Sequence, residues 1–167
     1  MKYHIRRMDR AITDPAKLER ILMETRFITV AMCRDNIPYL VSISHFYDPS
    51  AKRLYFHCAT EGKKMDFWRA NPRVWGQAII DHGYVEGECN HLYVMAMFDG
   101  TVHIAEANEE KRRIMNYMFD RQEKKSHGGE VDPHKERITK DAELGRAAVG
   151  WIAVEEITGK RSKDITF

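Results

Sequence analysis

Short apolar, β-rich runs recur along this chain between turn signals, and they predict an antiparallel sheet. The predicted strands cover residues 27–33, 39–47, 54–56, 74–80, 92–106 and 147–157. Alternation divides the second run between two faces, with Tyr39, Val41, Ile43 and His45 on one and Leu40, Ser42, Ser44 and Phe46 on the other. Gly100 in the long fifth run indicates a bulge, a common means of curving a barrel.

Helical signals lie between these strands. Asp14 is a good helix cap before Pro15, and an apolar side of Leu18, Ile21 and Leu22 follows. Further helices are predicted over residues 63–69, from Asn108 to about residue 125, and from Asp132-Pro133 to Leu144. We expect residues 1–12 to form an arm, residues 81–91 a polar loop, 126–129 a flexible loop and 159–167 a basic tail.

The stretch from residue 54 to residue 72 carries the clearest candidate chemistry. A strand ends at His57-Cys58-Ala59-Thr60, Gly62 breaks it, and a helix starts at Lys63-Lys64. Unpaired N–H groups and the helix dipole favour an anion at such a start, and the two lysines add formal charge, which suits a phosphate. The alternative is a solvated lysine pair on an ordinary strand–helix connection.

The same stretch resembles the pattern YFHxAxxGxKxDxLRxNPR of the FMN-binding split-barrel proteins. It is most similar to the pyridoxamine 5'-phosphate oxidase-like branch, which includes the 5-nitroimidazole-resistance flavoproteins. Four further segments resemble family motifs in the same order along the chain: residues 6–11, 38–44, 98–102 and 155–160. Five motifs in order are specific, whereas any one of them would be weak.

The resemblance implies a mainly β fold with flanking helices, namely an antiparallel split β-barrel of six or seven strands, in a single domain over residues 1–167. It also implies a homodimer that binds FMN, or FAD, at the subunit interface. Carried over by position, the cofactor-binding residues are Leu40, Val41, Ser42, Ile43, His57, Cys58, Ala59, Thr60, Lys63 and Lys64. Of the two lysines, Lys64 matches the basic position of the family's GxK.

Two departures from the family pattern affect the expected site. Ser42 stands where relatives have proline, which leaves a backbone N–H and a hydroxyl that they lack. His91-Leu92-Tyr93-Val94 stands where the nitroimidazole-resistance branch has YRSV, so the arginine and serine of that motif are missing.

The resemblance implies an FMN-dependent oxidoreductase that reduces a small aromatic or nitro compound, with His57 as the candidate catalytic residue. The alternatives are a flavin-binding electron carrier or sensor without a substrate, and a barrel that binds haem or another ligand. For His57 itself, the alternative is a histidine held by a neighbouring carbonyl. A Cys58 nucleophile is disfavoured because adjacent strand residues point to opposite faces.

Composition and cysteine spacing bear on the class of protein and its compartment. Lys and Arg number 27 against 25 Asp and Glu, and this near balance disfavours a nucleic-acid-binding protein. Three widely spaced cysteines indicate reduced thiols in the cytoplasm, and we expect neither a signal peptide nor a membrane anchor.

His82, Glu86, Glu88, Cys89 and His91 match no common zinc pattern, which favours a polar loop over a metal site. Phe67, Trp68 and Trp75 are candidate aromatic residues of a dimer interface.

Overall fold

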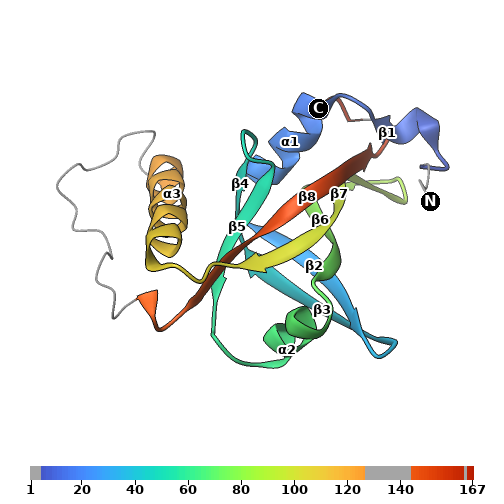
Figure 1. The fold of residues 1–167 in the computed structure, drawn as a ribbon. Coiled ribbons are helices and arrows are strands. Elements are labelled where there is room, and N and C mark those ends of the chain that lie inside the picture. Colours follow the sequence, from blue (N-terminus) through green and yellow to red (C-terminus); the bar gives the residue numbers. More distant parts are fainter. Residues whose placement is uncertain (1–4, 127–143, 164) are drawn as a thin grey trace.

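The computed structural model describes residues 5–126, 144–163 and 165–167. Their strands form one antiparallel sheet in the order β3-β2-β6-β7-β8-β5-β4, with β1 paired to β8 (Figure 1). In chain order the elements are a 3-10 helix Met8–Arg10, β1 Ala11–Ile12, α1 Pro15–Glu24, β2 Phe27–Arg34, β3 Ile37–Ser44, β4 Phe46–Asp48, β5 Arg53–Cys58, α2 Lys63–Ala70, β6 Arg73–Val85, β7 Asn90–Ile104, α3 Asn108–Ser126 and β8 Ala148–Arg161.

The sheet curls until β3 and β5 approach each other without pairing, so the barrel is open along one side. This confirms the predicted split barrel with flanking helices. The described residues form eight strands rather than six or seven, because the two-residue β1 and the three-residue β4 also pair into the sheet.

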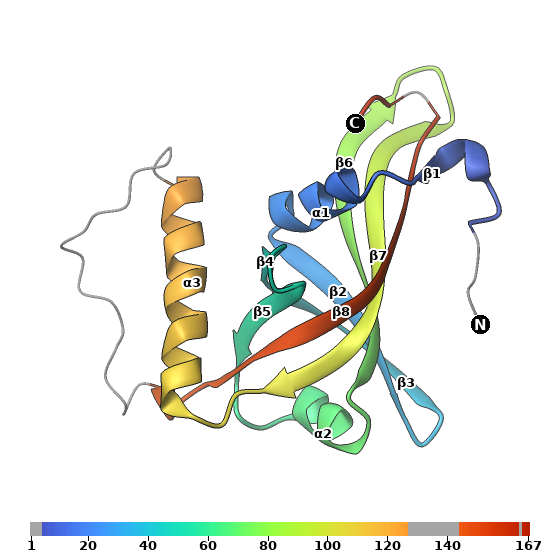
Figure 2. The same ribbon diagram turned by 45° about the horizontal axis from the view of Figure 1, so that its top comes forward.

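Two apolar clusters hold the helices to the sheet. The larger cluster fills the barrel, with α1 at one end and α2 at the other (Figure 2). From α2 it takes Met65, Phe67 and Trp68, which are all buried. The smaller cluster packs α3 against the outer side of β5 and β8, around Tyr55 and Val149. No helix in the described ranges is both long and apolar enough to cross a membrane.

The predicted strand over residues 39–47 is wrong as a single element, because His45 interrupts it. The His45 side chain is buried, its Nε2 lies 2.8 Å from the Leu22 carbonyl oxygen, and its backbone N–H donates to the Arg26 carbonyl oxygen at 3.3 Å. Before it, β3 pairs with β2, and after it, β4 pairs with β5. The chain therefore changes from one side of the open barrel to the other at His45.

The predicted polar loop over residues 81–91 is mostly a continuation of the sheet. β6 and β7 pair as far as Val85 and Asn90, which leaves only residues 86–89 as the turn. A bulge follows Asp81, whose carboxylate accepts the Gly83 N–H at 2.8 Å, and Gly83 has a φ of +92°. Among the described residues, no three His, Cys, Asp or Glu side chains come together as metal ligands would.

The ends of the barrel also differ from expectation. The predicted arm contributes β1, and the first residues of the predicted basic tail belong to β8, where Gly159 pairs with both Ile12 and Ala96.

The bulge predicted at Gly100 is confirmed by a register shift between Asp99 and Gly100. The helix predicted from Asp132 lies outside the described residues, except for Leu144, which is buried.

Candidate functional site

The split between β3 and β5 leaves backbone polar groups without sheet partners. Within the described sheet, β3 pairs only with β2, so its other edge is open. On β5, residues 53–55 pair with β4, and residues 56–58 extend beyond it. The two open edges approach each other, and unpaired backbone groups there can hydrogen-bond a ligand.

Helix α2 begins beside this split, one short loop after β5. Gly62 is the N-cap residue of α2, with φ +117° and ψ 170°, and no side chain caps the helix. A Cβ at Gly62 would meet no atom within 4 Å. Glycine is therefore required by the backbone angle, and the space in front of the helix start is open to an anion.

The two lysines at the start of α2 occupy different positions. The Lys63 ammonium lies 4.5 Å from the centre of the Tyr39 ring and 5.8 Å from that of Phe67. The half-buried Lys64 extends toward Cys58: burial raises the pKa of that thiol, and the charge of Lys64 and a hydrogen bond from it oppose part of the rise. Lys63 thus contacts the β3 side of the split, and Lys64 the β5 side.

The connections before and after α2 are held by two residues whose roles the sequence did not show. Arg69 Nη2 donates to the Thr60 carbonyl oxygen at 3.2 Å. Asn71 Nδ2 donates to the Cys33 carbonyl oxygen at 3.1 Å, and its Oδ1 accepts the Arg73 N–H. Their only sequence signal is the RxNPR end of the family pattern, which gives no partner for either side chain.

His57 and Cys58 point to opposite faces of β5, as strand alternation predicts. His57 is exposed, and its ring makes no hydrogen bond with any described residue. Cys58 packs against the barrel core, with its Sγ 3.9 Å from Met65 Sδ, and burial raises the pKa of its thiol. No carbonyl group of the described residues is a partner for His57, and the protonated thiol of Cys58 is a poor nucleophile.

The four candidate residues on β3 also alternate between faces. Val41 and Ile43 pack inward, so only their backbone can reach a ligand at the open edge. Leu40 and Ser42 are exposed on the outer face, and Ser42 Oγ lies 3.1 Å from Thr29 Oγ on β2. The backbone of these β3 residues, the end of β5 and the start of α2 therefore flank one split, whereas the Leu40 and Ser42 side chains lie on the outer face of the sheet.

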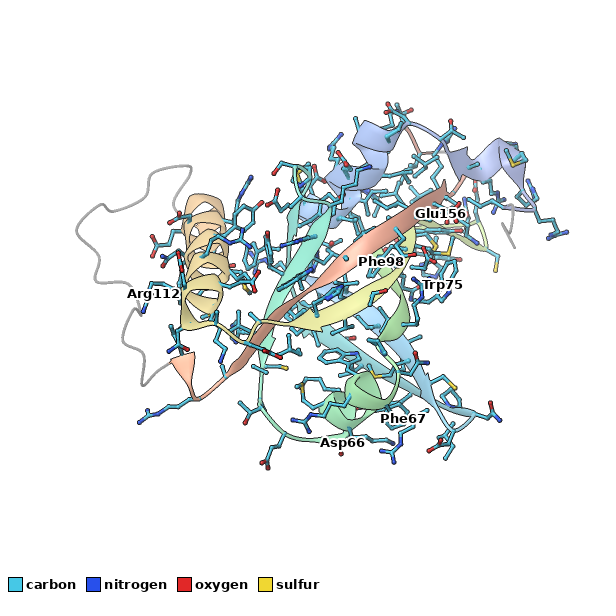
Figure 3. The ribbon with its side chains drawn as sticks, in the orientation of Figure 1. Asp66, Phe67, Trp75, Phe98, Arg112 and Glu156 are labelled. Carbon is cyan, nitrogen blue, oxygen red and sulfur yellow. The ribbon has the colours of Figure 1, made fainter. Side chains whose placement is uncertain are left out.

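The aromatic residues suggested for an interface separate into two groups. Phe67 and Trp68 are buried within the chain, and Trp68 packs on Phe56 with ring centres 5.1 Å apart. Trp75 is 52% exposed on the outer face of β6, and the strand register places it in one cross-strand row with Asp99 and Glu156. Figure 3 labels Trp75 and Glu156 of this row. Of these three aromatic residues, only Trp75 remains available to a partner.

The fold resembles solved structures that share little sequence with this chain. A candidate 5-nitroimidazole antibiotic resistance protein from Bacteroides thetaiotaomicron matches with a TM-score of 0.74 and 23% identity, over 90% of this chain and 86% of that one. A FAD and heme binding protein from Mycobacterium smegmatis matches with a TM-score of 0.74 and 17% identity, over 95% and 76% of the two chains. A FAD-binding protein from Mesorhizobium loti matches with a TM-score of 0.65 and 17% identity, over 92% and 97%.

At these identities the structural likeness shows the fold alone. Among curated proteins, no sequence matches this chain. The family model described as pyridoxamine 5'-phosphate oxidase matches residues 14–161, which is most of the chain. The chain therefore belongs to the pyridoxamine 5'-phosphate oxidase family, as its five motifs predict.

Proposed function

We propose that this protein is an FMN-dependent oxidoreductase that holds the cofactor in the split between β3 and β5 and reduces a small aromatic or nitro compound. The observation that carries the proposal is the meeting of two open sheet edges with the uncapped start of α2, where Lys64 lies. The family membership and the solved FAD-binding proteins of this fold support a flavin as the ligand.

The phosphate of FMN would lie at the start of α2. Thr60 and the backbone N–H groups after Gly62 would donate to it, and Lys64 would supply the charge. Lys63 already faces two aromatic rings, so we assign it a supporting role. One lysine directed to the site suits the single phosphate of FMN better than the diphosphate of FAD.

The ring of the flavin would lie along the open edge of β3, where backbone groups of residues 40–43 can bond its polar atoms. Bound FMN would supply the electron-transfer chemistry. The chain would hold the phosphate, fix the ring edge and keep one ring face accessible. His57 is exposed at the end of β5 and has no partner among the described residues, so it can contact flavin or substrate.

We further propose a homodimeric, single-domain protein of the cytoplasm. The outer face of β2, β3 and β6 exposes Phe27, Leu40, Trp75 and Ile79, and contiguous exposed apolar residues of this kind mark interaction surfaces. All three cysteines are free, and two of them are exposed, which suits a reducing compartment.

Purification of the full chain tests the proposal directly. We expect a yellow protein whose released small molecule has the mass of FMN, and NADH or NADPH oxidation that depends on a nitroaromatic acceptor. Flavin without turnover would make the protein a carrier or a sensor. Absence of bound flavin, together with failure of added FMN to bind, would refute the proposal.

A further inference from the structure

A cavity of about 260 Å³ lies beside α1, the helix at the end of the barrel opposite α2 (Figure 2). Its lining comes from the start of α1, from β4, from the turn between β4 and β5, and from β8. None of the lining residues belongs to β2, β3, β5, β6 or α2. The cavity is therefore separate both from the split proposed for the flavin and from the apolar face proposed for the dimer.

One wall of the cavity is apolar. Leu18 of α1 and Val154 of β8 are buried, and Ile157 of β8 is half-buried. The ring of Tyr47, which is 3% exposed, also lines the cavity. Such a wall favours an aliphatic group, because burial removes its methyl groups from water. The volume lies below the roughly 300 Å³ at which ligand pockets usually begin, so the cavity suits a molecule of the size of one amino acid.

Glu19 of α1 gives the cavity a fixed negative charge. The Tyr47 hydroxyl donates a hydrogen bond to Glu19 Oε1 at 3.3 Å. Burial and the charge of Glu19 raise the pKa of Tyr47, so its phenol stays protonated and remains a donor at neutral pH. No cation among the described residues pairs with Glu19. Its other oxygen, Oε2, can therefore accept a hydrogen bond from an ammonium group.

Lys52, in the turn between β4 and β5, brings the opposite charge. Its φ is +51°, and its backbone carbonyl accepts the Val154 N–H at 3.0 Å, which fixes the turn on β8. Its exposed side chain makes no ion pair or hydrogen bond with the described residues. Glu155 also lines the cavity, but its carboxylate pairs with Arg73 and accepts a hydrogen bond from Thr101 Oγ at 3.1 Å. Among the described lining residues, the charges without an ionic partner are thus one carboxylate and one ammonium.

We propose that this cavity binds a free hydrophobic α-amino acid as its zwitterion. The ammonium group of the ligand lies on Glu19, its carboxylate on Lys52, and its side chain against the aliphatic wall. A simple amine would leave Lys52 without a partner, and a fatty acid would leave Glu19 without one. The N-terminus of a peptide offers the same ammonium and side chain but lacks the adjacent carboxylate. The inference does not depend on the proposed flavin function.

Ligand-observed NMR titration of the full chain tests the site with four probes. L-leucine carries all three groups, L-leucinamide lacks the carboxylate, 4-methylpentanoate lacks the ammonium, and glycine lacks the side chain. A pH of about 6 keeps the amino group of leucinamide charged. We expect L-leucine to bind most tightly, because each of the other probes loses one of the three contacts.

Two variants should divide the probes in opposite ways. Glu19→Gln should weaken L-leucine and L-leucinamide by about tenfold or more and spare 4-methylpentanoate. Lys52→Gln should weaken L-leucine and 4-methylpentanoate by about 1.5- to 5-fold, because Lys52 is exposed, and spare L-leucinamide. A general loss of structure would weaken all four probes alike, so it cannot produce this reciprocal pattern.

Glu24→Gln on α1 and Lys111→Gln on α3 are the matched controls, because each removes the same charge at a residue outside the cavity. Both should bind every probe as the wild type does. L-leucinamide that binds as tightly as L-leucine would assign the cavity to an amine or a peptide N-terminus and overturn the inference. L-leucine that shows no saturable binding up to about 10 mM, weaker than a millimolar affinity, would also overturn it.

FMN titrated into the same variants separates this inference from the proposed function. Glu19→Gln and Lys52→Gln should bind FMN as the wild type does. A parallel loss of FMN and L-leucine would show that the substitutions act through the fold, and it would overturn the amino-acid site. A wild-type chain that binds L-leucine with the expected pattern but not FMN would support the site and refute only the flavin proposal.

Discussion

Adjacent lysines at a helix start are chemically alike, but their surroundings give them different roles. Lys63 is held over the rings of Tyr39 and Phe67, whereas Lys64 extends toward Cys58 and the open end of β5. We expect Lys64→Ala to weaken FMN by about 10- to 150-fold, as the loss of a charge-assisted contact predicts. Riboflavin lacks the phosphate and should lose little affinity in the same titration.

Lys63→Ala is the matched control for this prediction. It removes an equal charge from the neighbouring position, and it should affect FMN much less than Lys64→Ala does. Equal losses for FMN and riboflavin in Lys64→Ala would mean that this lysine acts through the fold, and the phosphate assignment would be wrong.

His57 offers a second test at the residue scale. Because its ring is exposed and makes no hydrogen bond with the described residues, His57→Ala should leave the urea midpoint of unfolding nearly unchanged. If the ring contacts flavin or substrate, the variant should shift the flavin absorption bands or lower turnover. Unchanged spectra and rates would remove His57 from the site.

The Cys58 thiol gives a pH-dependent prediction. Burial raises its pKa above that of a free thiol, and Lys64 opposes part of this shift. At pH 8 iodoacetamide should therefore modify Cys58 more slowly than the exposed Cys33 and Cys89, with peptide mass spectrometry as the readout. Lys64→Ala should slow Cys58 further. In urea all three thiols should react alike, and a Cys58 that reacts fastest in the folded chain would contradict the argument.

The raised pKa of Cys58 makes the stability of the protein decline as the pH rises. Folding favours the protonated form of the Cys58 thiol. The stabilisation that this thiol contributes is therefore fully present at pH values below its pKa in the unfolded chain. It is lost as the pH rises through the higher pKa of the folded protein. Cys58→Ser should accordingly flatten the decline of stability at alkaline pH.

Sequence patterns located the candidate residues but not their partners. The family motif marks Lys64 and His57 directly, and strand alternation correctly separates His57 from Cys58. The contact of Lys63 with Tyr39 and the bond of Arg69 to Thr60 depend on how α2 docks across the barrel mouth. Such contacts between elements have no periodicity along the chain, so neither was predictable.

Among the elements, β7 has a steric reason for glycine at position 100, beside its register shift with β8, and this can be tested. A Cβ at Gly100 would lie 2.3 Å from the backbone oxygen of Ala153, which cannot move without breaking the β7–β8 pairing. Gly100→Ala should destabilise the protein by about 1–3 kcal/mol, the usual cost of overpacking. Urea unfolding would measure this loss, and an unchanged midpoint would show that the strand can shift.

Gly76 provides the contrast to Gly100. A Cβ there would meet the Phe98 ring at 2.3 Å, which is a side chain rather than backbone. Adding Phe98→Leu to Gly76→Ala should therefore restore part of the lost stability, whereas no single side-chain change should rescue Gly100→Ala. A double-mutant cycle measures that coupling.

Element boundaries were predictable where local chemistry decides them. Asp14 caps α1 as expected, with its carboxylate accepting the Ala16 N–H at 3.0 Å. Prediction failed at His45 and over residues 81–91, where pairing partners decide the structure. His45 has the strand pattern on both sides. Residues 81–83 are Asp, His and Gly and lack a strand pattern, yet β7 extends far enough for the sheet to continue past them to Val85.

At the scale of the whole molecule, the motifs predicted the family and the split barrel, while the positions of the open edges required the structure. The proposed homodimer follows from what the outer face of β2, β3 and β6 leaves uncovered. Phe27, Leu40, Trp75 and Ile79 are each about half exposed or more on one face of the sheet. Aromatic and aliphatic residues in such a cluster are the usual core of an interface.

We therefore expect light scattering to give about twice the 19.6 kDa chain mass at micromolar concentration. Phe27→Glu should lower that mass toward the monomer, because a charge buried without a partner costs several kcal/mol at an interface. Met8→Glu places the same charge on another exposed apolar residue, 63% exposed in the N-terminal 3-10 helix, and should leave the dimer intact. A wild-type chain that stays monomeric, or a dimer that survives Phe27→Glu unchanged, would show that this face is not the interface.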